Sequence, residues 1–224
     1  TAAGDKSTVQ RIDYSSDTST WATKGPLSSA RYKLVGAGNK DYGYHASGAP
    51  VSPAPKSTVD RIDYSNDTAT AAVKGPLSAA RAYMGGATGN QSYGYFGGGQ
   101  IPGPSKVTTV DRVDYSSDTS TATVKGPLGV ISYNAQVVGN ASYGYWTGGR
   151  PSGWSVSTVQ RIDYGNDTAT APSKGPLDRT TYIAAGTGNN SYGYIAGDFS
   201  KTNVSRIDYS SDSSTASPKG SLSI

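Results

Sequence analysis

Short segments in which polar and apolar residues alternate recur along the whole chain. The clearest reads Arg-Ile-Asp-Tyr, with Val once in place of Ile, and its copies begin at Arg11, Arg61, Arg112, Arg161 and Arg206. Alternation with a period of two places the apolar residue and the Tyr on one face of a β-strand. No segment shows the 3.6-residue period of an amphipathic helix. The pattern therefore predicts an all-β chain.

These strand motifs belong to a longer repeat, because their starts lie 50, 51, 49 and 45 residues apart. A Lys-Gly-Pro-Leu link recurs at Lys24, Lys74, Lys125 and Lys174. A Tyr-Gly-Tyr motif recurs at Tyr42, Tyr93, Tyr143 and Tyr192. A period of about 50 residues with only strand and turn signals is typical of β-propeller blades.

Each repeat is expected to hold four strands. In the second repeat the expected strands are 81–87, 92–96, 109–115 and 120–124. A variable loop joins the second strand to the third, and short turns rich in Ser, Asn and Asp join the others. The Gly of Tyr-Gly-Tyr weakens a strand unless another group approaches closely, so we expect blades to crowd together there.

The sequence predicts a β-propeller of four-stranded antiparallel blades, in one domain spanning 1–224. The repeats cover about 28–77, 78–128, 129–177 and 178–222, with a partial repeat at 1–27. We expect five blades, the fifth shared between the two termini. Since the partial repeat has no Tyr-Gly-Tyr strand, we also expect that sequence precedes Thr1.

The repeat resembles the kelch family of propellers. The leading Arg of a kelch blade is matched by Arg31 and Arg81, and its double Gly by Gly97-Gly98 and Gly148-Gly149. Trp21 stands where the fourth-strand Trp of that family belongs. The third-strand aromatic residue is matched by Tyr14, Tyr64, Tyr115, Tyr164 and Tyr209. Kelch propellers often serve as protein-interaction scaffolds, so the resemblance implies that function as one alternative.

The chain also departs from the kelch pattern. Ala replaces the Trp in four copies, at Ala71, Ala122, Ala171 and Ala216, and only one Gly of the pair remains at Gly48 and Gly197. The wording of the repeat also resembles repeat proteins of marine bacteriophage virions and tail fibres. That resemblance implies a virion or an extracellular surface as the location, and assembly with other virion proteins.

Composition narrows the function classes. The chain has 224 residues, no Cys and one His, so thiolate metal sites and sites with two imidazoles are excluded. Kelch-type copper oxidases need His and Cys ligands that are missing here, and we expect no cofactor and no metal. The net charge of +4 is dispersed along the repeats, and no apolar run reaches the length of a membrane helix. We therefore expect neither nucleic-acid binding nor membrane insertion.

Candidate binding residues lie in the variable loops, because varied loops on a rigid repeat commonly form a binding surface. We expect the second-to-third loops and the Lys-Gly-Pro-Leu links to share one face, and the short turns to share the other. The candidates on this long-loop face are His45, Phe96, Trp146, Arg150, Trp154 and Phe199. For Phe96 and Trp146 the alternative is that they cover blade edges.

Charged residues of the repeat offer two further hypotheses. The link lysines Lys24, Lys74, Lys125 and Lys174 form either a ring that attracts an anionic glycan or a set of cross-blade pairs. The Arg and Asp of each strand motif lie on one face and are expected to form a structural network between blades. These pairs are Arg11 with Asp13, Arg61 with Asp63, Arg112 with Asp114, Arg161 with Asp163 and Arg206 with Asp208. The Asp-containing turns favour turn capping over calcium binding.

The preferred functional hypothesis is a non-catalytic binding or structural propeller. It would recognise a surface glycan or a protein through the long-loop face. A kelch-type interaction scaffold is the first alternative, and a glycan-active enzyme is the second. An enzyme is disfavoured because the few carboxylates outside the repeat, Asp5, Asp41, Asp178 and Asp198, form no pair that is visible in the sequence.

Overall fold

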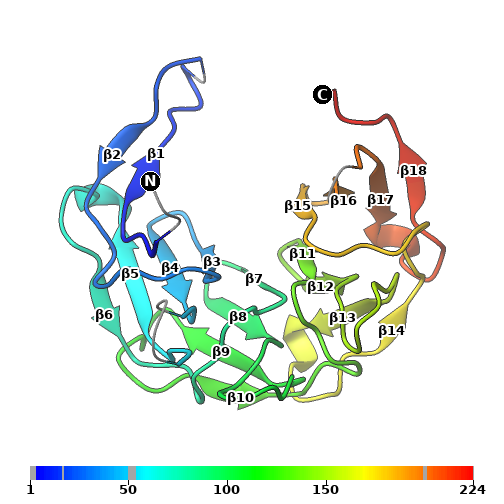
Figure 1. Cartoon of the computed structure of the whole chain (residues 1–224), viewed down its shortest axis with the longest axis horizontal. Coiled ribbons are helices and arrows are strands. Elements are labelled where there is room, and N and C mark those ends of the chain that lie inside the picture. Colours follow the sequence, from blue (N-terminus) through cyan, green and yellow to red (C-terminus); the bar gives the residue numbers. More distant parts are fainter. Residues whose placement is uncertain (1–3, 17, 50–53, 199–200, 224) are drawn as a thin grey trace.

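The computed structural model describes residues 4–16, 18–49, 54–198 and 201–223. They form five antiparallel sheets arranged side by side in an arc (Figure 1). Four sheets have four strands each, in simple up-and-down order, and we call them blades 1 to 4 in chain order. The fifth has two strands and is called the N-terminal sheet. The predicted all-β propeller class is confirmed.

The strands are short, and each blade repeats the same lengths. The N-terminal sheet contains β1 (Val9–Arg11) and β2 (Ala22–Lys24). Blade 1 contains β3 (Val35–Gly38), β4 (Tyr42–Ala46), β5 (Val59–Asp63) and β6 (Ala72–Lys74). Blade 2 contains β7 (Gly86–Gly89), β8 (Tyr93–Gly97), β9 (Val110–Asp114) and β10 (Thr123–Lys125). Blade 3 contains β11 (Gln136–Gly139), β12 (Tyr143–Thr147), β13 (Val159–Asp163) and β14 (Ser173–Lys174). Blade 4 contains β15 (Ala185–Gly188), β16 (Tyr192–Ala196), β17 (Val204–Asp208) and β18 (Ser217–Lys219). Single 3-10 turns follow three of the third strands, at η1 (Tyr64–Asn66), η2 (Tyr164–Asn166) and η3 (Tyr209–Ser211).

The first strand of a repeat begins later than the sequence predicts. In the second repeat it starts at Gly86, and Arg81 and Ala82 form only isolated bridges. The fully buried Arg81 guanidinium pairs with Asp111 of the same blade, and Tyr83 has a φ of 54°. A left-handed residue interrupts regular strand geometry, so the segment around Tyr83 cannot extend the strand toward Arg81.

Most of the apolar core lies between blades. One cluster joins Tyr44 and Val59 of blade 1 to Phe96 and Tyr115 of blade 2. Equivalent clusters join blades 2 and 3, and blades 3 and 4. Each blade is therefore stabilised chiefly by its neighbours, as in other repeat architectures.

The predicted close approach at Tyr-Gly-Tyr is present. A Cβ added to Gly94 would lie 2.6 Å from the Tyr115 hydroxyl oxygen. At Gly94 the group that approaches is the third-strand Tyr of the same blade, whereas at Gly144 and Gly193 a side chain of the preceding blade comes closest, Thr88 at 2.5 Å and Val138 at 2.6 Å. Because the Tyr115 ring crosses the strand at this point, a side chain at position 94 would collide with it.

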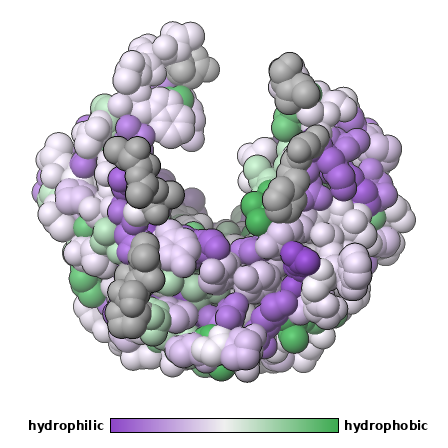
Figure 2. Space-filling view, viewed as in Figure 1, coloured by the Kyte–Doolittle hydropathy of each residue, from purple (hydrophilic) through white to green (hydrophobic). Residues whose placement is uncertain are grey.

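The arc is open between the N-terminal sheet and blade 4, and the two chain ends lie on either side of the opening (Figure 1). The same opening is visible in the space-filling view (Figure 2). Among the described residues after β18, none pairs with the N-terminal sheet. The fifth sheet therefore has strands from the N-terminal part of the chain alone.

Candidate binding face

A turn Asp ties each blade to the one before it. At the interface of blades 1 and 2, Asp118 accepts hydrogen bonds from the Tyr44 hydroxyl at 2.8 Å and from Arg61 Nη1 at 2.7 Å. Lys74 Nζ lies 3.2 Å from the other carboxylate oxygen of Asp118. We call the Tyr, Arg and Lys of one blade, arranged around the turn Asp of the next, the inter-blade socket.

The socket recurs at the other interfaces. Arg112 and Lys125 contact Asp167, Arg161 and Lys174 contact Asp212, and Arg11 and Lys24 of the N-terminal sheet contact Asp67. Tyr95 and Tyr145 donate their hydroxyls to Asp167 and Asp212. A stacked ring pair accompanies three of these sockets: Tyr44 with Tyr115, Tyr95 with Tyr164, and Tyr145 with Tyr209, with centroids 4.5, 4.7 and 4.8 Å apart.

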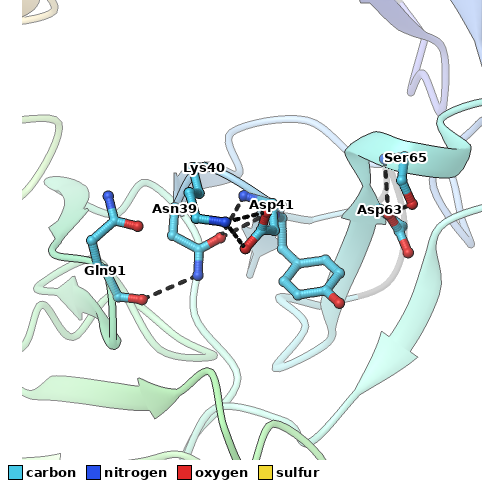
Figure 3. Close-up of polar contacts among 7 residues, drawn as sticks. Asn39, Lys40, Asp41, Asp63, Ser65 and Gln91 are labelled. Atoms are coloured by element: carbon cyan, nitrogen blue, oxygen red, sulfur yellow. Dashed lines mark hydrogen bonds and ion pairs between the residues drawn. The ribbon is translucent and has the colours of Figure 1, made fainter.

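Two expectations about charged residues need correction. Four of the strand Arg residues, Arg11, Arg61, Arg112 and Arg161, do form an inter-blade network, but their partner is the turn Asp and not the Asp of the strand motif. Arg206 has no such partner among the described residues. Asp63 instead accepts a hydrogen bond from the Ser65 backbone at 2.9 Å (Figure 3), and Asp13, Asp114, Asp163 and Asp208 cap their turns in the same way. The link lysines Lys24, Lys74, Lys125 and Lys174 make cross-blade pairs with the turns, so links and turns do not occupy separate faces.

The charges in the socket determine the ionisation of its carboxylate. Burial alone would raise the pKa of Asp167. Hydrogen bonds from Tyr95 and Lys125, with the nearby Arg112 charge, outweigh this and hold the pKa below its ordinary value. The pKa of Asp212 is lowered against burial by its own Tyr, Lys and Arg partners. The same burial, with the carboxylate partner, raises the pKa of Tyr95.

The short turns between first and second strands form a regular polar edge. The Asn39 side-chain oxygen accepts hydrogen bonds from the backbones of Asp41 and Tyr42, both at 2.9 Å. Its amide nitrogen donates to the backbone oxygen of Gln91 in the next blade at 3.1 Å (Figure 3). Asn140 and Asn190 repeat this link between blades 3 and 4. The hydrogen bonds of this edge hold one blade in position against the next, and they are made between the turn residues themselves.

Three aromatic or imidazole candidates are not on the long-loop surface. Phe96 and Trp146 are 0% and 1% exposed and belong to the inter-blade cores. His45 lies in β4 and borders a pocket between blade 1 and the N-terminal sheet, where burial lowers its pKa. Their strand positions turn these side chains toward the adjacent sheet instead of the loops. Phe199 lies outside the described residues.

Arg150 and Trp154 remain exposed in the loop of blade 3, as expected. Trp154 is 82% exposed, beside Gly153, whose φ is 98°. The Arg150 guanidinium lies 5.4 Å from the Tyr182 ring centroid. Tyr182 belongs to a row of tyrosine side chains on the same face.

One Tyr from the start of each repeat joins a row that crosses three blade boundaries. Tyr32 and Tyr83 meet edge to face with centroids 6.5 Å apart, and Tyr83 stacks on Tyr133 at 5.3 Å. The row continues toward Tyr182, whose hydroxyl accepts a hydrogen bond from the Asn134 amide at 3.3 Å. We call Tyr32, Tyr83, Tyr133 and Tyr182 the tyrosine track.

Cations lie along the tyrosine track. Lys33 Nζ is 3.6 Å from the Tyr83 ring centroid, and Lys106 Nζ is 4.6 Å from that of Tyr133. Hydrogen bonding from the Lys33 ammonium lowers the pKa of Tyr83. Lys106 is also held by the backbone oxygens of Arg150 and Pro151. Ammonium and guanidinium groups over tyrosine rings give a surface suited to anions and to flat polar groups.

A pocket of about 210 Å³ opens beside the track. Tyr32 and Tyr83 line it together with residues of two long loops, namely Ala49, Ala54, Pro55, Gln100, Ile101 and Gly103. The tyrosine track therefore lies on the long-loop face that the sequence analysis selects. In the described part of the chain no group of three or more His, Asp or Glu side chains is placed to hold a metal ion. No helix in that part is long and apolar enough to cross a membrane.

Sequence reasoning missed the tyrosine track, although a signal for it exists. A Tyr stands shortly before the first strand of every repeat, at positions 32, 83, 133 and 182. Its neighbours change from repeat to repeat, so no fixed motif surrounds it. Alignment of the repeats by their links places Tyr32, Tyr133 and Tyr182 at one position, but Tyr83 one residue later, where the other repeats carry Lys33, Asn134 and Ile183. Even such an alignment would therefore not have shown that the four rings form one row.

The fold and these sites define a β-propeller with an aromatic and cationic row on its loop face. No protein-family model matches the chain, and no curated protein matches it. Among solved structures it is similar to YjhT, a β-propeller, with a TM-score of 0.76 and 11% identity. The alignment covers 100% of this chain and 86% of that one. At this identity the likeness shows the propeller fold alone.

Proposed function

We propose that the chain is a non-catalytic binding propeller that recognises an anionic surface glycan along the tyrosine track. The observation that carries the proposal is the row of rings from successive blades, with Lys33, Lys106 and Arg150 beside them. Tyr faces stack on sugar rings, and the cations complement carboxylate or sulfate groups. The resemblance to phage repeat proteins favours a virion or appendage as its setting.

The arrangement favours an extended ligand. The rings of Tyr32, Tyr83 and Tyr133 are in contact across blade boundaries, so neighbouring units of a chain would meet one ring after another. Each blade contributes one ring and the loops contribute the differing neighbours. Such a surface combines a row of rings with side chains that distinguish one glycan from another.

The test is binding of the intact chain to heparin, to desulfated heparin and to dextran by calorimetry, alongside a glycan array. We expect binding to heparin that weakens as salt rises, and little binding to neutral dextran. Tyr83→Ala and Lys33→Gln should each weaken binding by about tenfold, equivalent to about 1.4 kcal/mol. Lys40→Gln is the matched control, because Lys40 is exposed, pairs with the adjacent Asp41 and lies on the turn edge.

An unchanged affinity in Tyr83→Ala and Lys33→Gln would contradict the proposal, as would a wild-type chain that binds no anionic glycan. The kelch-type scaffold predicts a different result. The exposed ring of Trp154 has the character of a protein anchor. Loss of a captured protein in Trp154→Ala, with glycan binding absent, would favour that alternative.

A further inference from the structure

A further pocket, of about 340 Å³, opens on the short-turn edge at the boundary of blades 1 and 2. Tyr42 of blade 1 lines it together with Gln91, Ser92, Tyr93 and Asp114 of blade 2. Its volume lies within the range of about 300–1,000 Å³ that is common for small-molecule sites. The pocket lies at the start of β8, whereas the long loop leaves from the end of that strand. This pocket is therefore separate from the tyrosine track.

The walls of the pocket are fixed by hydrogen bonds of their own. The Asn39 amide of blade 1 donates to the Gln91 backbone oxygen of blade 2, 3.1 Å away, so the two sides of the pocket are joined (Figure 3). On the far side, the Ser116 backbone and hydroxyl donate to Oδ1 of Asp114 at 2.9 and 2.7 Å. Because these turns are ordered before a ligand arrives, binding costs little ordering of the protein.

Several polar groups of the pocket have no partner within the protein. In the part of the chain that the structure describes, Oδ2 of Asp114 and the side chains of Gln91 and Ser92 make no hydrogen bond. A carboxylate oxygen only accepts, whereas the Gln amide and the Ser hydroxyl both donate and accept. A ligand with several hydroxyl groups matches all three, because each hydroxyl also donates and accepts.

The charges around the pocket favour a neutral ligand. The hydrogen bond from the Ser116 hydroxyl, opposed by burial, lowers the pKa of Asp114, so the carboxylate is ionised at neutral pH and repels an anion. The Arg112 guanidinium lies 4.3 Å from the Tyr93 ring centroid, so a cation would meet a like charge there. Tyr42 and Tyr93 supply apolar ring surface, against which the C–H groups of a pyranose pack well.

We propose that this pocket binds a neutral sugar. The ring hydroxyls bond to Asp114, Gln91 and Ser92, and the ring packs beside Tyr42 and Tyr93. The site differs in chemistry from the tyrosine track, where Lys and Arg side chains favour anionic units. A sugar on the short-turn edge also leaves the long-loop face free, so the chain would bind carbohydrate at two places.

The next blade boundary carries a reduced copy of the same wall. At the boundary of blades 2 and 3, the positions of Gln91 and Ser116 are held by Ala141 and Gly165. Neither of these residues has a polar side chain, so this boundary should bind the sugar more weakly. The repeat thus supplies both a matched control and a place in which a second site could be built.

The test is an NMR titration of the isotope-labelled full chain with the methyl glycosides of glucose, galactose, mannose and N-acetylglucosamine. The side-chain amide signals of Gln91, identified by their absence in Gln91→Ala, report on this pocket alone. We expect them to shift with at least one glycoside and to saturate with a dissociation constant of about 1–10 mM, because each hydrogen bond to the sugar replaces one to water. Glycerol at the same concentration should leave them in place. Binding this weak contributes little heat in the calorimetry with dextran.

Asp114→Asn gives the sharpest result, because Asn caps a turn about as well as Asp and the variant loses only the carboxylate charge. It should weaken binding about tenfold. Asp163→Asn, the same change at the reduced boundary, should leave the dissociation constant unchanged. Ala141→Gln with Gly165→Ser should add a second side-chain amide that shifts with the same sugar. A dispersed spectrum of each variant verifies that it is folded.

Three results would overturn the proposal. One is a Gln91 amide that stays in place with all four glycosides up to about 50 mM, well above the expected dissociation constant. The second is a shift that Asp114→Asn retains at full affinity. The third is an equal shift with glycerol, which would mean that the pocket does not recognise a sugar ring. The signals of Tyr32 and Tyr83 report on the tyrosine track, so either binding proposal can fail without the other.

Discussion

Asp167→Asn should weaken the contact between blades 2 and 3 by about 2 kcal/mol. The Asp167 side chain is 8% exposed and lies within 2.8 Å of Arg112 Nη1 and 3.1 Å of Lys125 Nζ. A hydrogen bond to a charged group contributes about 1.5–3 kcal/mol. The cations are 22% and 13% exposed, so solvent reduces each loss to about 1 kcal/mol. With its oxygen in the Oδ2 position, Asn still accepts from the Tyr95 hydroxyl and from Arg112 Nη1, so what is lost is the negative charge opposite both cations and the acceptor for Lys125.

Urea unfolding followed by tryptophan fluorescence measures this loss. Trp146 is buried between blades 2 and 3, whereas Trp21 and Trp154 are 52% and 82% exposed. The part of the emission that shifts on unfolding therefore reports on the interface that Asp167 joins. For a chain of this size, about 2 kcal/mol corresponds to a fall in melting temperature of about 4–8 °C.

Asp163→Asn is the matched control, since Asp163 is four residues away and accepts a hydrogen bond from the Gly165 backbone at 2.9 Å. Asn and Asp cap turns about equally well, so this substitution should have little effect. If Asp167→Asn costs no more than Asp163→Asn, the socket contributes nothing to stability. The reasoning about blade order would then be wrong.

Two further predictions concern the same interfaces. The pKa values of Asp167 and Asp212 are lowered in the folded chain, so these ionised carboxylates contribute their full stabilisation above the unfolded carboxyl pKa and lose it as pH falls through the folded value. The urea midpoint of unfolding should therefore drop below about pH 4. A midpoint that rises there would contradict this sign. Gly94→Ala places a Cβ 2.6 Å from the Tyr115 hydroxyl oxygen and should cost about 1–3 kcal/mol. Gly220→Ala, with nothing within 4 Å, should be neutral, and equal melting temperatures for the two variants would refute the clash.

The fold was predictable because its signals are local and repeated. Alternation over Val110–Asp114 and the Tyr-Gly-Tyr motif each specify a strand within a few residues, and the links give the period. The start of the first strand was not predictable, since it follows a residue in the left-handed region, which is Lys33, Tyr83, Asn134 or Ile183 in the four repeats. Gly is the residue type that usually signals such a backbone conformation, and none of these positions is a Gly.

The candidate site was less predictable than the fold. Phe96 and Trp146 follow Tyr-Gly-Tyr directly and therefore differ by one position from Tyr95 and Tyr145. Alternate positions of a strand face opposite sides, but both sides of an inner strand are covered in a propeller. Sequence alone therefore could not separate a buried aromatic residue from a displayed one, and it could not show that Tyr32, Tyr83 and Tyr133 meet.

The choice between the two Asp residues of each repeat illustrates the same limit. Asp63 and Asp67 are four residues apart, and each stands near a strand Arg in the sequence. Asp63 lies beside Arg61 on the strand, but its carboxylate is engaged by the turn that follows it. Asp67 lies beyond that turn and reaches Arg11 and Lys24 of the preceding sheet. Only the packing of two repeats determines which carboxylate crosses the boundary.

The polar socket explains how a chain with 34% hydrophobic residues keeps its blades in order. Apolar contacts between blades are non-directional and would tolerate a shift of one blade over another. A carboxylate held by a hydroxyl and two cations tolerates no such shift, because a displaced blade would leave three charged groups poorly paired.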